Sequence, residues 1–292
     1  MAVTDRFMLT GKTAIVTGAS SGLGVCFARA LGQAGANVIL AARRTELLEG
    51  VAASMEAEGS VALVQGCDVS DSASVEAMVE AGWKKFGRID VLVNNAGVAA
   101  EAGFLPERTP DELWLQTINT NLNGLFWASR EVGRRQLEDG KGGSIINVAS
   151  VMGLSGHQNL APAYQASKGA VVNLTRNLGV SWADRGVRVN CLAPGWFPSE
   201  MTNAWFAVPE FLDRFQHSAP MARIGDPDEL VGALLFLASD ASSFVTGQVL
   251  AVDGGYSAAG GTAGLYSDHL YAVQESVMGE AGTPIRPAVH AG

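Results

Sequence analysis

The chain has 292 residues, of which 48% are hydrophobic and 17% charged, with 35 glycines and 10 prolines, which indicates a globular protein and excludes a disordered one. The 20 Lys and Arg residues against 29 Asp and Glu give a net charge of −9. Because such a chain repels nucleic-acid phosphates and anionic lipids, we expect neither a nucleic acid nor a membrane as its partner.

Short β-branched runs alternate along the chain with longer amphipathic stretches, the pattern of repeated βαβ units. We expect an α/β fold, a Rossmann-like doubly wound parallel sheet covered by helices on both faces, with three layers in a single domain. The predicted strands are Thr13–Thr17, Asn37–Ala41, Ala62–Gln65, Val91–Asn94, Ser144–Ala149, Arg188–Ala193 and Val249–Val252. The predicted helices are Ser21–Ala34, Glu46–Glu58, Ser72–Phe86, Pro110–Leu137, Tyr164–Ala183 and Asp226–Leu237, with Asp71, Pro110 and Pro227 near helix starts.

No boundary, repeat or linker interrupts this pattern before Gly255. We therefore expect one domain over residues 1–256 and a C-terminal extension over residues 257–292, which is rich in Ala, Gly and Ser. Two interpretations of the extension stay open. It is either a partly disordered terminus or a segment that docks on a partner subunit.

The three cysteines, Cys26, Cys67 and Cys191, are widely spaced and form no CxxC pair. Such a set favours neither a disulfide framework nor a metal site, so we expect a reducing compartment and no bound metal. At the N-terminus, Asp5 and Arg6 interrupt the apolar stretch that a signal peptide needs. We therefore expect a cytoplasmic protein.

A glycine-rich turn, TGASSGLG, follows the first predicted strand and leads into a helix that begins near Ser21. Gly18 can take the turn out of the strand, Gly22 admits a pyrophosphate to the backbone, and Gly24 lets helix and sheet pack closely. The helix N-terminus offers free N–H groups to an anion. The turn predicts a dinucleotide site, although three glycines that only make a tight turn remain the alternative.

Tyr164 and Lys168 are four residues apart at the start of a predicted helix, so their side chains project from one face. A neighbouring ammonium favours the phenolate and lowers the pKa of a tyrosine below its usual value of about 10. The spacing predicts a general acid–base pair. An exposed pair without a chemical role is the alternative.

These two motifs, together with NNAG at Asn94–Gly97, resemble the short-chain dehydrogenase/reductase family from about Leu9 to Tyr256. The resemblance implies that Ser150, at the end of GGSIINVAS, hydrogen-bonds the substrate oxygen. It implies that Asn121, in NTNLNGLF, links the lysine to a proton-relay water. The cofactor contacts expected from the motifs and the resemblance are Gly18, Ser20, Ser21, Gly22, Leu23, Gly24, Arg43, Asp68, Val69, Asn95, Ala96, Gly97, Tyr164, Lys168, Pro194, Gly195, Phe197 and Ser199.

The implied activity is reversible hydride transfer between a nicotinamide and a secondary alcohol or ketone, with Tyr164 as acid and base and Ser150 at the developing oxyanion. Lys168 would lower the pKa of Tyr164 and hold the nicotinamide ribose. The gap from Ser150 to Tyr164 is one residue longer than is common in the family. We therefore expect the loop around Gly156 and His157 to bulge at the substrate.

The choice of cofactor depends on the residues that end the second predicted strand. An NAD site usually has an acid there, about 20 residues beyond the glycines, whereas this chain has Ala42 followed by Arg43 and Arg44. Because an arginine binds a 2′-phosphate and a carboxylate repels it, we expect NADP(H) in preference to NAD(H). Two solvated surface arginines are the alternative.

Many aromatic residues lie between Trp196 and Met221, which the resemblance identifies as a lid over the substrate. They favour an apolar or ring-bearing alcohol or ketone. The substrate candidates are His157, Trp196, Trp205 and Phe206. A 3-oxoacyl-carrier-protein reductase, a polyol or sugar dehydrogenase and a catalytically silent dinucleotide-binding regulator remain alternatives. The resemblance also implies a homotetramer or homodimer, assembled through the predicted helices 110–137 and 164–183.

Overall fold

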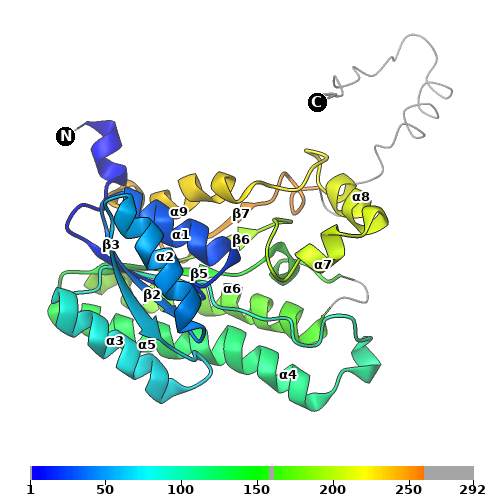
Figure 1. The fold of residues 1–292 in the computed structure, drawn as a ribbon, viewed down its shortest axis with the longest axis horizontal. Coiled ribbons are helices and arrows are strands. Elements are labelled where there is room, and N and C mark those ends of the chain that lie inside the picture. The colour runs from blue at the N-terminus through cyan, green and yellow to red at the C-terminus, as the bar shows by residue number, and fades with distance from the viewer. Residues whose placement is uncertain (1, 158–160, 260–292) are drawn as a thin grey trace, which may run out of the picture.

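In the computed structural model, which describes residues 2–157 and 161–259, seven parallel strands form one sheet (Figure 1). Their order is β3-β2-β1-β4-β5-β6-β7. All seven strands lie where the sequence predicts them, with ends that differ by at most one residue. Their bounds are β1 Thr13–Thr17, β2 Asn37–Ala42, β3 Val61–Gly66, β4 Val91–Asn94, β5 Gly143–Val148, β6 Val187–Pro194 and β7 Val249–Val252.

Helices cover both faces of this sheet (Figure 1). Alternate residues of β1 face different layers: Ala14 and Val16 pack into one buried cluster with α1, α2 and α9, and Ile15 packs into the other with α3, α5 and α6. The predicted three-layer, Rossmann-like fold is confirmed. The bounds are α1 Gly22–Gln33, α2 Thr45–Ala57, α3 Ser72–Phe86, α4 Asp111–Ile118, α5 Leu125–Asp139, α6 Pro162–Trp182, α7 Asn203–Phe206, α8 Pro209–Ser218 and α9 Val231–Ala238.

Two of the predicted helix starts carry side-chain caps. Asp71 accepts a hydrogen bond of 3.0 Å from the N–H of Ala73 and caps α3. Asp226 likewise caps the 3₁₀ turn Pro227–Leu230 that leads into α9, with its oxygen 3.0 Å from the N–H of Asp228. Local sequence therefore fixes where these helices begin.

The predicted helix over 110–137 is confirmed as one continuous helical run, but a π-helical segment that the sequence did not predict, Asn119–Gly124, joins α4 to α5 within it. Gly124 packs so closely on the next layer that a Cβ there would lie 2.5 Å from the carbonyl oxygen of Val69. The Asn121 side chain turns toward the backbone of Val98, with which it makes two 2.8 Å hydrogen bonds. Such π segments often occur at functional sites.

The lid segment, residues 196–221, contains two helices that the sequence analysis did not predict. Helices α7 and α8 lie side by side at one end of the molecule and contain no buried residue (Figure 1). The described helices include none that is long and apolar enough to cross a bilayer. Within the same residues, no group of three His, Cys, Asp or Glu could hold a metal ion. The predicted extension falls largely on residues 260–292, outside the described residues, so the division after residue 256 stays a prediction.

Candidate active site

A cleft of about 430 Å³ opens at the carboxyl ends of the strands. It contains the point where the strand order changes direction between β1 and β4, which is where open α/β sheets bind ligands. All eighteen predicted cofactor residues line it, as does Ser150, whereas Asn121, His157, Trp196, Trp205 and Phe206 do not. Ala42 and Arg44, which the sequence analysis used to choose the cofactor, also line it. Sequence reasoning missed the other lining residues, namely Cys67, Val98, Thr120, Val148, Ala149, Glu200, Met201 and Thr202.

The glycine-rich turn at one end of the cleft fits a pyrophosphate. Gly18 has a φ of +67°, and a Cβ on it would lie 2.8 Å from the Cα of Ala96. A Cβ on Gly24 would collide with the Gly18 carbonyl oxygen, so the turn needs both glycines. Ser21 precedes α1 without capping it through its side chain, which leaves the first N–H groups of the helix free for an anion.

A second contact joins this turn to the end of β4. The amide of Asn95 donates hydrogen bonds to the carbonyl oxygens of Thr17 and Gly18, at 3.0 and 3.3 Å. In return, the Thr17 hydroxyl oxygen accepts hydrogen bonds of 3.1 Å from the N–H groups of Asn95 and Ala96. The NNAG sequence thus holds the two strands that flank the ligand crevice at a fixed separation.

Arg44 and Glu200 meet across the same end of the cleft. Arg44 donates to Glu200 at 2.9 Å and to the hydroxyls of Ser20 and Ser21 at 3.1 and 3.0 Å. Arg43, the arginine singled out from the sequence, is exposed on the cleft beside Asp68. Burial raises the pKa of Asp68, but hydrogen bonds from Ser70 and the charge of Arg43 outweigh it and bring that pKa below its usual value.

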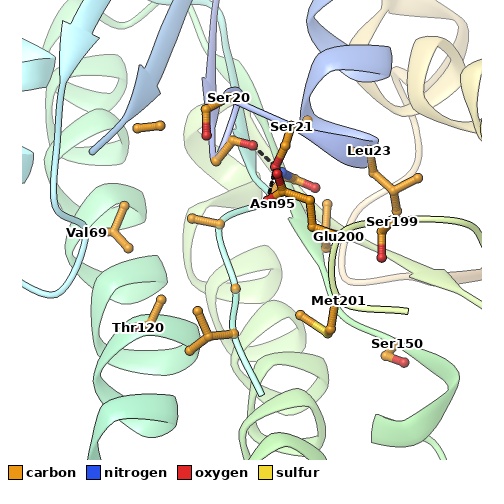
Figure 2. Close-up of a pocket in the computed structure, with 18 of the residues that line it drawn as sticks. Ser20, Ser21, Leu23, Val69, Asn95, Thr120, Ser150, Ser199, Glu200 and Met201 are labelled. Atoms are coloured by element: carbon orange, nitrogen blue, oxygen red, sulfur yellow. Dashed lines mark hydrogen bonds between the residues drawn. The ribbon is translucent and has the colours of Figure 1, made fainter. Parts of the chain in front are cut away.

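The catalytic candidates Ser150, Tyr164 and Lys168 lie together at the other end (Figure 2 shows Ser150). Ser150 follows β5 and caps a 3₁₀ turn by accepting a 3.2 Å hydrogen bond from the N–H of Met152. Lys168 is buried on α6, with Nζ 5.5 Å from the centre of the Tyr164 ring and 2.8 Å from the carbonyl oxygen of Val148. These residues are therefore fixed by two different elements, the end of β5 and the first turns of α6.

The expected direction of the Tyr164 pKa is wrong. Burial raises the pKa of the Tyr164 phenol above its ordinary value, and a hydrogen bond with Ser150 lowers it only in part. Burial also lowers the pKa of the Lys168 ammonium to about 8. Desolvation dominates because Lys168 is buried at the junction of α6 and β5, and the half-buried Tyr164 lies against it in the cleft wall. The phenol is therefore held in its protonated, proton-donating form.

Glu101 is a buried carboxylate behind Tyr164 that the sequence analysis overlooked. It is 0% exposed, and one oxygen accepts a 2.8 Å hydrogen bond from the backbone N–H of Tyr164. The other oxygen accepts a hydrogen bond from the hydroxyl of Thr117. The only sequence signal was an isolated acid in the stretch after NNAG, and nothing local connects that stretch to α6.

Asn121 lies in the π segment, where its side-chain nitrogen also donates to the Ser167 hydroxyl at 3.1 Å. Its oxygen is on the same side as Lys168, because a Cβ on Gly97 would lie 3.4 Å from both the Asn121 Oδ1 and the Lys168 Nζ. The structure therefore brings Asn121 near the lysine. Its role in a proton relay stays a prediction.

An aromatic cluster stands beside the catalytic end. The ring of His157 stacks on Tyr256 with centroids 5.6 Å apart, and His157 Nδ1 is 2.9 Å from the Tyr256 hydroxyl. Burial lowers the pKa of His157, which favours the neutral ring. Trp196 packs on Phe215 of α8, with centroids 4.3 Å apart, and on the edge of Tyr256. The other two substrate candidates pack within the lid, Trp205 on Phe211 and Phe206 on Phe215.

This chain is similar to known oxidoreductases in sequence. The sequence family described as enoyl-(acyl carrier protein) reductase matches residues 18–257. Gluconate 5-dehydrogenase of Gluconobacter oxydans is 42% identical over 251 residues, which cover 86% of this chain and 96% of that protein. Galactitol 2-dehydrogenase (L-tagatose-forming) of Cereibacter sphaeroides is 42% identical over 252 residues, which cover 86% of this chain and 97% of that protein.

A solved structure extends the comparison to the fold. The gluconate 5-dehydrogenase of Burkholderia cenocepacia, crystallised in complex with NADP and tartrate, superposes with a TM-score of 0.84 at 36% identity. The match covers 88% of this chain and 99% of that protein. The likeness thus extends over most of this chain.

Proposed function

The chain belongs to the short-chain dehydrogenase/reductase family, which makes it an NAD(P)-dependent oxidoreductase acting on CH–OH groups, and we propose that it uses NADP(H) to interconvert a neutral polyol and the corresponding ketose. The observation that carries this proposal is the junction of Ser150, Tyr164 and Lys168 at the end of a cleft whose other end fits a pyrophosphate. A panel of substrates tests it.

Tyr164 is the general acid and base of the proposed reaction. During reduction its phenol donates a proton to the ketone oxygen, and during oxidation it takes the proton from the alcohol. The Ser150 hydroxyl, hydrogen-bonded to Tyr164, stabilises the negative charge that develops on the same oxygen. Because burial raises the pKa of Tyr164, the phenol stands ready in the protonated form that reduction needs.

The cofactor, when bound, supplies the two-electron redox chemistry. The glycine turn and the free N-terminus of α1 would hold its pyrophosphate, and Lys168 would contact the nicotinamide ribose. Arg43 and Arg44, with no acid at the end of β2, support NADP(H) over NAD(H). The NADP found in the related Burkholderia structure points the same way.

The named relatives support a polyol or sugar substrate rather than the apolar alcohol or ketone that the aromatic lid segment suggested. The charges that line the cleft support a polyol over a sugar acid. Of the described residues that line the cleft, the cationic ones are Arg43, Arg44 and Lys168. The two arginines lie at the glycine-turn end, and Lys168 is bonded to Val148. A substrate carboxylate would therefore find no free cation among these residues, which favours a neutral substrate.

A cyclic ketone is the second candidate, because the rings of Trp196, Phe215 and Tyr256 form a cluster that such a substrate could join, although these residues lie outside the cleft lining. The family description names an acyl-carrier reductase, whereas the chain has a net charge of −9, which disfavours an acidic carrier. A silent regulator is the least supported reading, because the catalytic residues are all present.

Initial rates with purified protein distinguish these candidates. We expect NADP⁺ with galactitol to give a kcat/KM at least about tenfold above that with gluconate, because a buried unpaired charge is costly. Faster turnover of gluconate, of a cyclic alcohol or of a 3-oxoacyl thioester would replace the proposal by the corresponding alternative. Light scattering on the same sample tests the homotetramer, which stays a prediction.

A further inference from the structure

We propose that Glu200 is a built-in competitor of the cofactor 2′-phosphate: its carboxylate binds Arg44 at the mouth of the cleft and must leave when a 2′-phosphate binds there. Glu200 would then set how strongly the protein prefers NADP(H) to NAD(H). This inference rests on the NADP(H) part of the proposed function and names a residue that controls it.

Three segments far apart in the sequence meet at this point. Arg44 is the residue that directly precedes α2. Ser20 and Ser21 belong to the glycine-rich turn, and Glu200 lies near the start of the lid segment, after β6 (Figure 2 labels these three residues). Both Glu200 oxygens contact the guanidinium, at 2.9 and 3.3 Å, and the Ser21 hydroxyl donates to Glu200 at 2.8 Å. The Glu200 carboxylate thus accepts hydrogen bonds from the Arg44 guanidinium and the Ser21 hydroxyl at the same time.

A phosphate needs the same partners that the carboxylate uses. Arginine binds carboxylates and phosphates through the same planar fork, so one Arg44 cannot serve both in this geometry. The Arg44 guanidinium and the Ser21 hydroxyl hold the pKa of Glu200 below its usual value, which keeps the carboxylate charged at neutral pH. A charged Glu200 left in place would also repel the incoming phosphate.

Because Arg44 and Glu200 are exposed to solvent, a phosphate can replace the carboxylate on Arg44 at low cost. The side chains of Arg44 and Glu200 are 45% and 58% exposed, and exposed ion pairs contribute little to stability. A dianionic phosphate can therefore displace the carboxylate, whereas a ribose hydroxyl cannot. Arg43, which is exposed on the same cleft, remains as a second cation for the phosphate.

Binding of adenosine fragments tests the inference without any redox reaction. Titration calorimetry compares adenosine 2′,5′-bisphosphate with 5′-ADP on the full chain. We expect Glu200→Gln to bind the 2′-phosphate fragment about fivefold to tenfold more tightly, while its affinity for 5′-ADP changes less than about twofold. Glu210→Gln is the matched control, because Glu210 is an exposed acid of the same lid segment outside the cleft lining. It should change neither affinity.

Three results would overturn the inference. The first is an unchanged or weaker affinity of Glu200→Gln for the 2′-phosphate fragment. The second is an equal gain for both fragments, which would reflect net charge alone. The third is a selective loss of 5′-ADP or NADH affinity, which would make Glu200 an acceptor for the ribose hydroxyl. A failure of the substrate proposal would appear instead as absent turnover with fragment binding intact, so the two failures are distinguishable.

Discussion

The buried carboxylate of Glu101 accepts a 2.8 Å hydrogen bond from the backbone N–H of Tyr164. Tyr164 is in the first turn of α6, where N–H groups lack partners within the helix, so a negative charge there is stabilised by the helix dipole. Glu101 thereby ties the loop after β4 to the backbone of the proposed acid–base residue. Glu101 is a positioning residue, because its two oxygens bind the Tyr164 N–H and the Thr117 hydroxyl, and it does not line the cleft.

Removing this contact should loosen the active site. We expect Glu101→Ala to lower the free energy of unfolding by about 1–3 kcal/mol, because it leaves the Tyr164 N–H and the Thr117 hydroxyl without their acceptor. The value of kcat should fall more than the cofactor affinity. Urea denaturation and steady-state kinetics measure both. Glu101→Gln, which keeps an acceptor oxygen, should recover part of the loss, and equal damage by both variants would contradict the positioning role.

Loss of the phenol should abolish chemistry while leaving binding intact. We expect Tyr164→Phe to lower kcat by about 10²- to 10⁴-fold, the usual contribution of a positioned acid or base. The glycine turn lies at the other end of the cleft, so the affinity for NADPH, measured by fluorescence quenching, should change little. Near-normal turnover in this variant would remove Tyr164 from the mechanism.

The lowered pKa of Lys168, about 8, should appear in the stability of the protein. An unfolded lysine titrates near pH 10.4, so between about pH 8 and pH 10.4 the unfolded chain binds more protons here than the folded one. The Lys168 contribution to stability therefore rises with pH across this window and is lowest below pH 8. The substitution Lys168→Met removes this pH-dependent contribution. We expect the stability of this variant relative to wild type to fall by up to about 3 kcal/mol from pH 7 to pH 10.5.

Denaturation at several pH values gives this difference directly. Burial raises the pKa of the neighbouring Cys191 to about 12 and that of Tyr164 above its usual value. Both groups are present in the variant as well, so most of their effect cancels in the comparison. A difference between the two proteins that stays constant with pH would contradict the burial of a titrating Lys168.

Arg43 should contribute to the affinity for a 2′-phosphate. We expect Arg43→Ala to raise the KM for NADPH about tenfold, the cost of one charge-assisted contact, with little effect on the KM for NADH. The comparison of the two coenzymes in one variant is its own control. If an equal effect on both coenzymes, or none, were observed, Arg43 would be only a solvated surface residue.

Glycine at position 153 should be needed for the geometry of the catalytic residues. A Cβ there would lie 2.5 Å from the carbonyl carbon of Lys168, so Gly153→Ala must push the Ser150 turn away from α6. We expect a loss of about 1–3 kcal/mol in the free energy of unfolding together with a lower kcat. Gly156→Ala in the same loop is the control, because a Cβ at Gly156 meets no atom of the described residues within 4 Å. Similar losses in both variants would argue against this packing.

Local patterns in the sequence predicted the seven strands, most helix starts and the residues of the glycine turn. Each depends on neighbours a few positions away: β-branched runs favour strands, Asp71 caps the helix that follows it, and glycines allow the backbone of the turn. The Tyr164 and Lys168 spacing likewise placed both side chains on one helix face.

Tertiary structure decided what no local pattern contains. The Arg44 to Glu200 pair joins residues 156 positions apart, and the Glu101 to Tyr164 contact spans 63. The π segment before α5 depends on how Gly124 packs against Val69 in another layer. The pKa of Tyr164 is raised, and not lowered as the sequence predicted, for the same reason. Desolvation depends on the atoms that the whole fold brings around the phenol. Sequence spacing gives the chemical groups, and packing sets their charge states and partners.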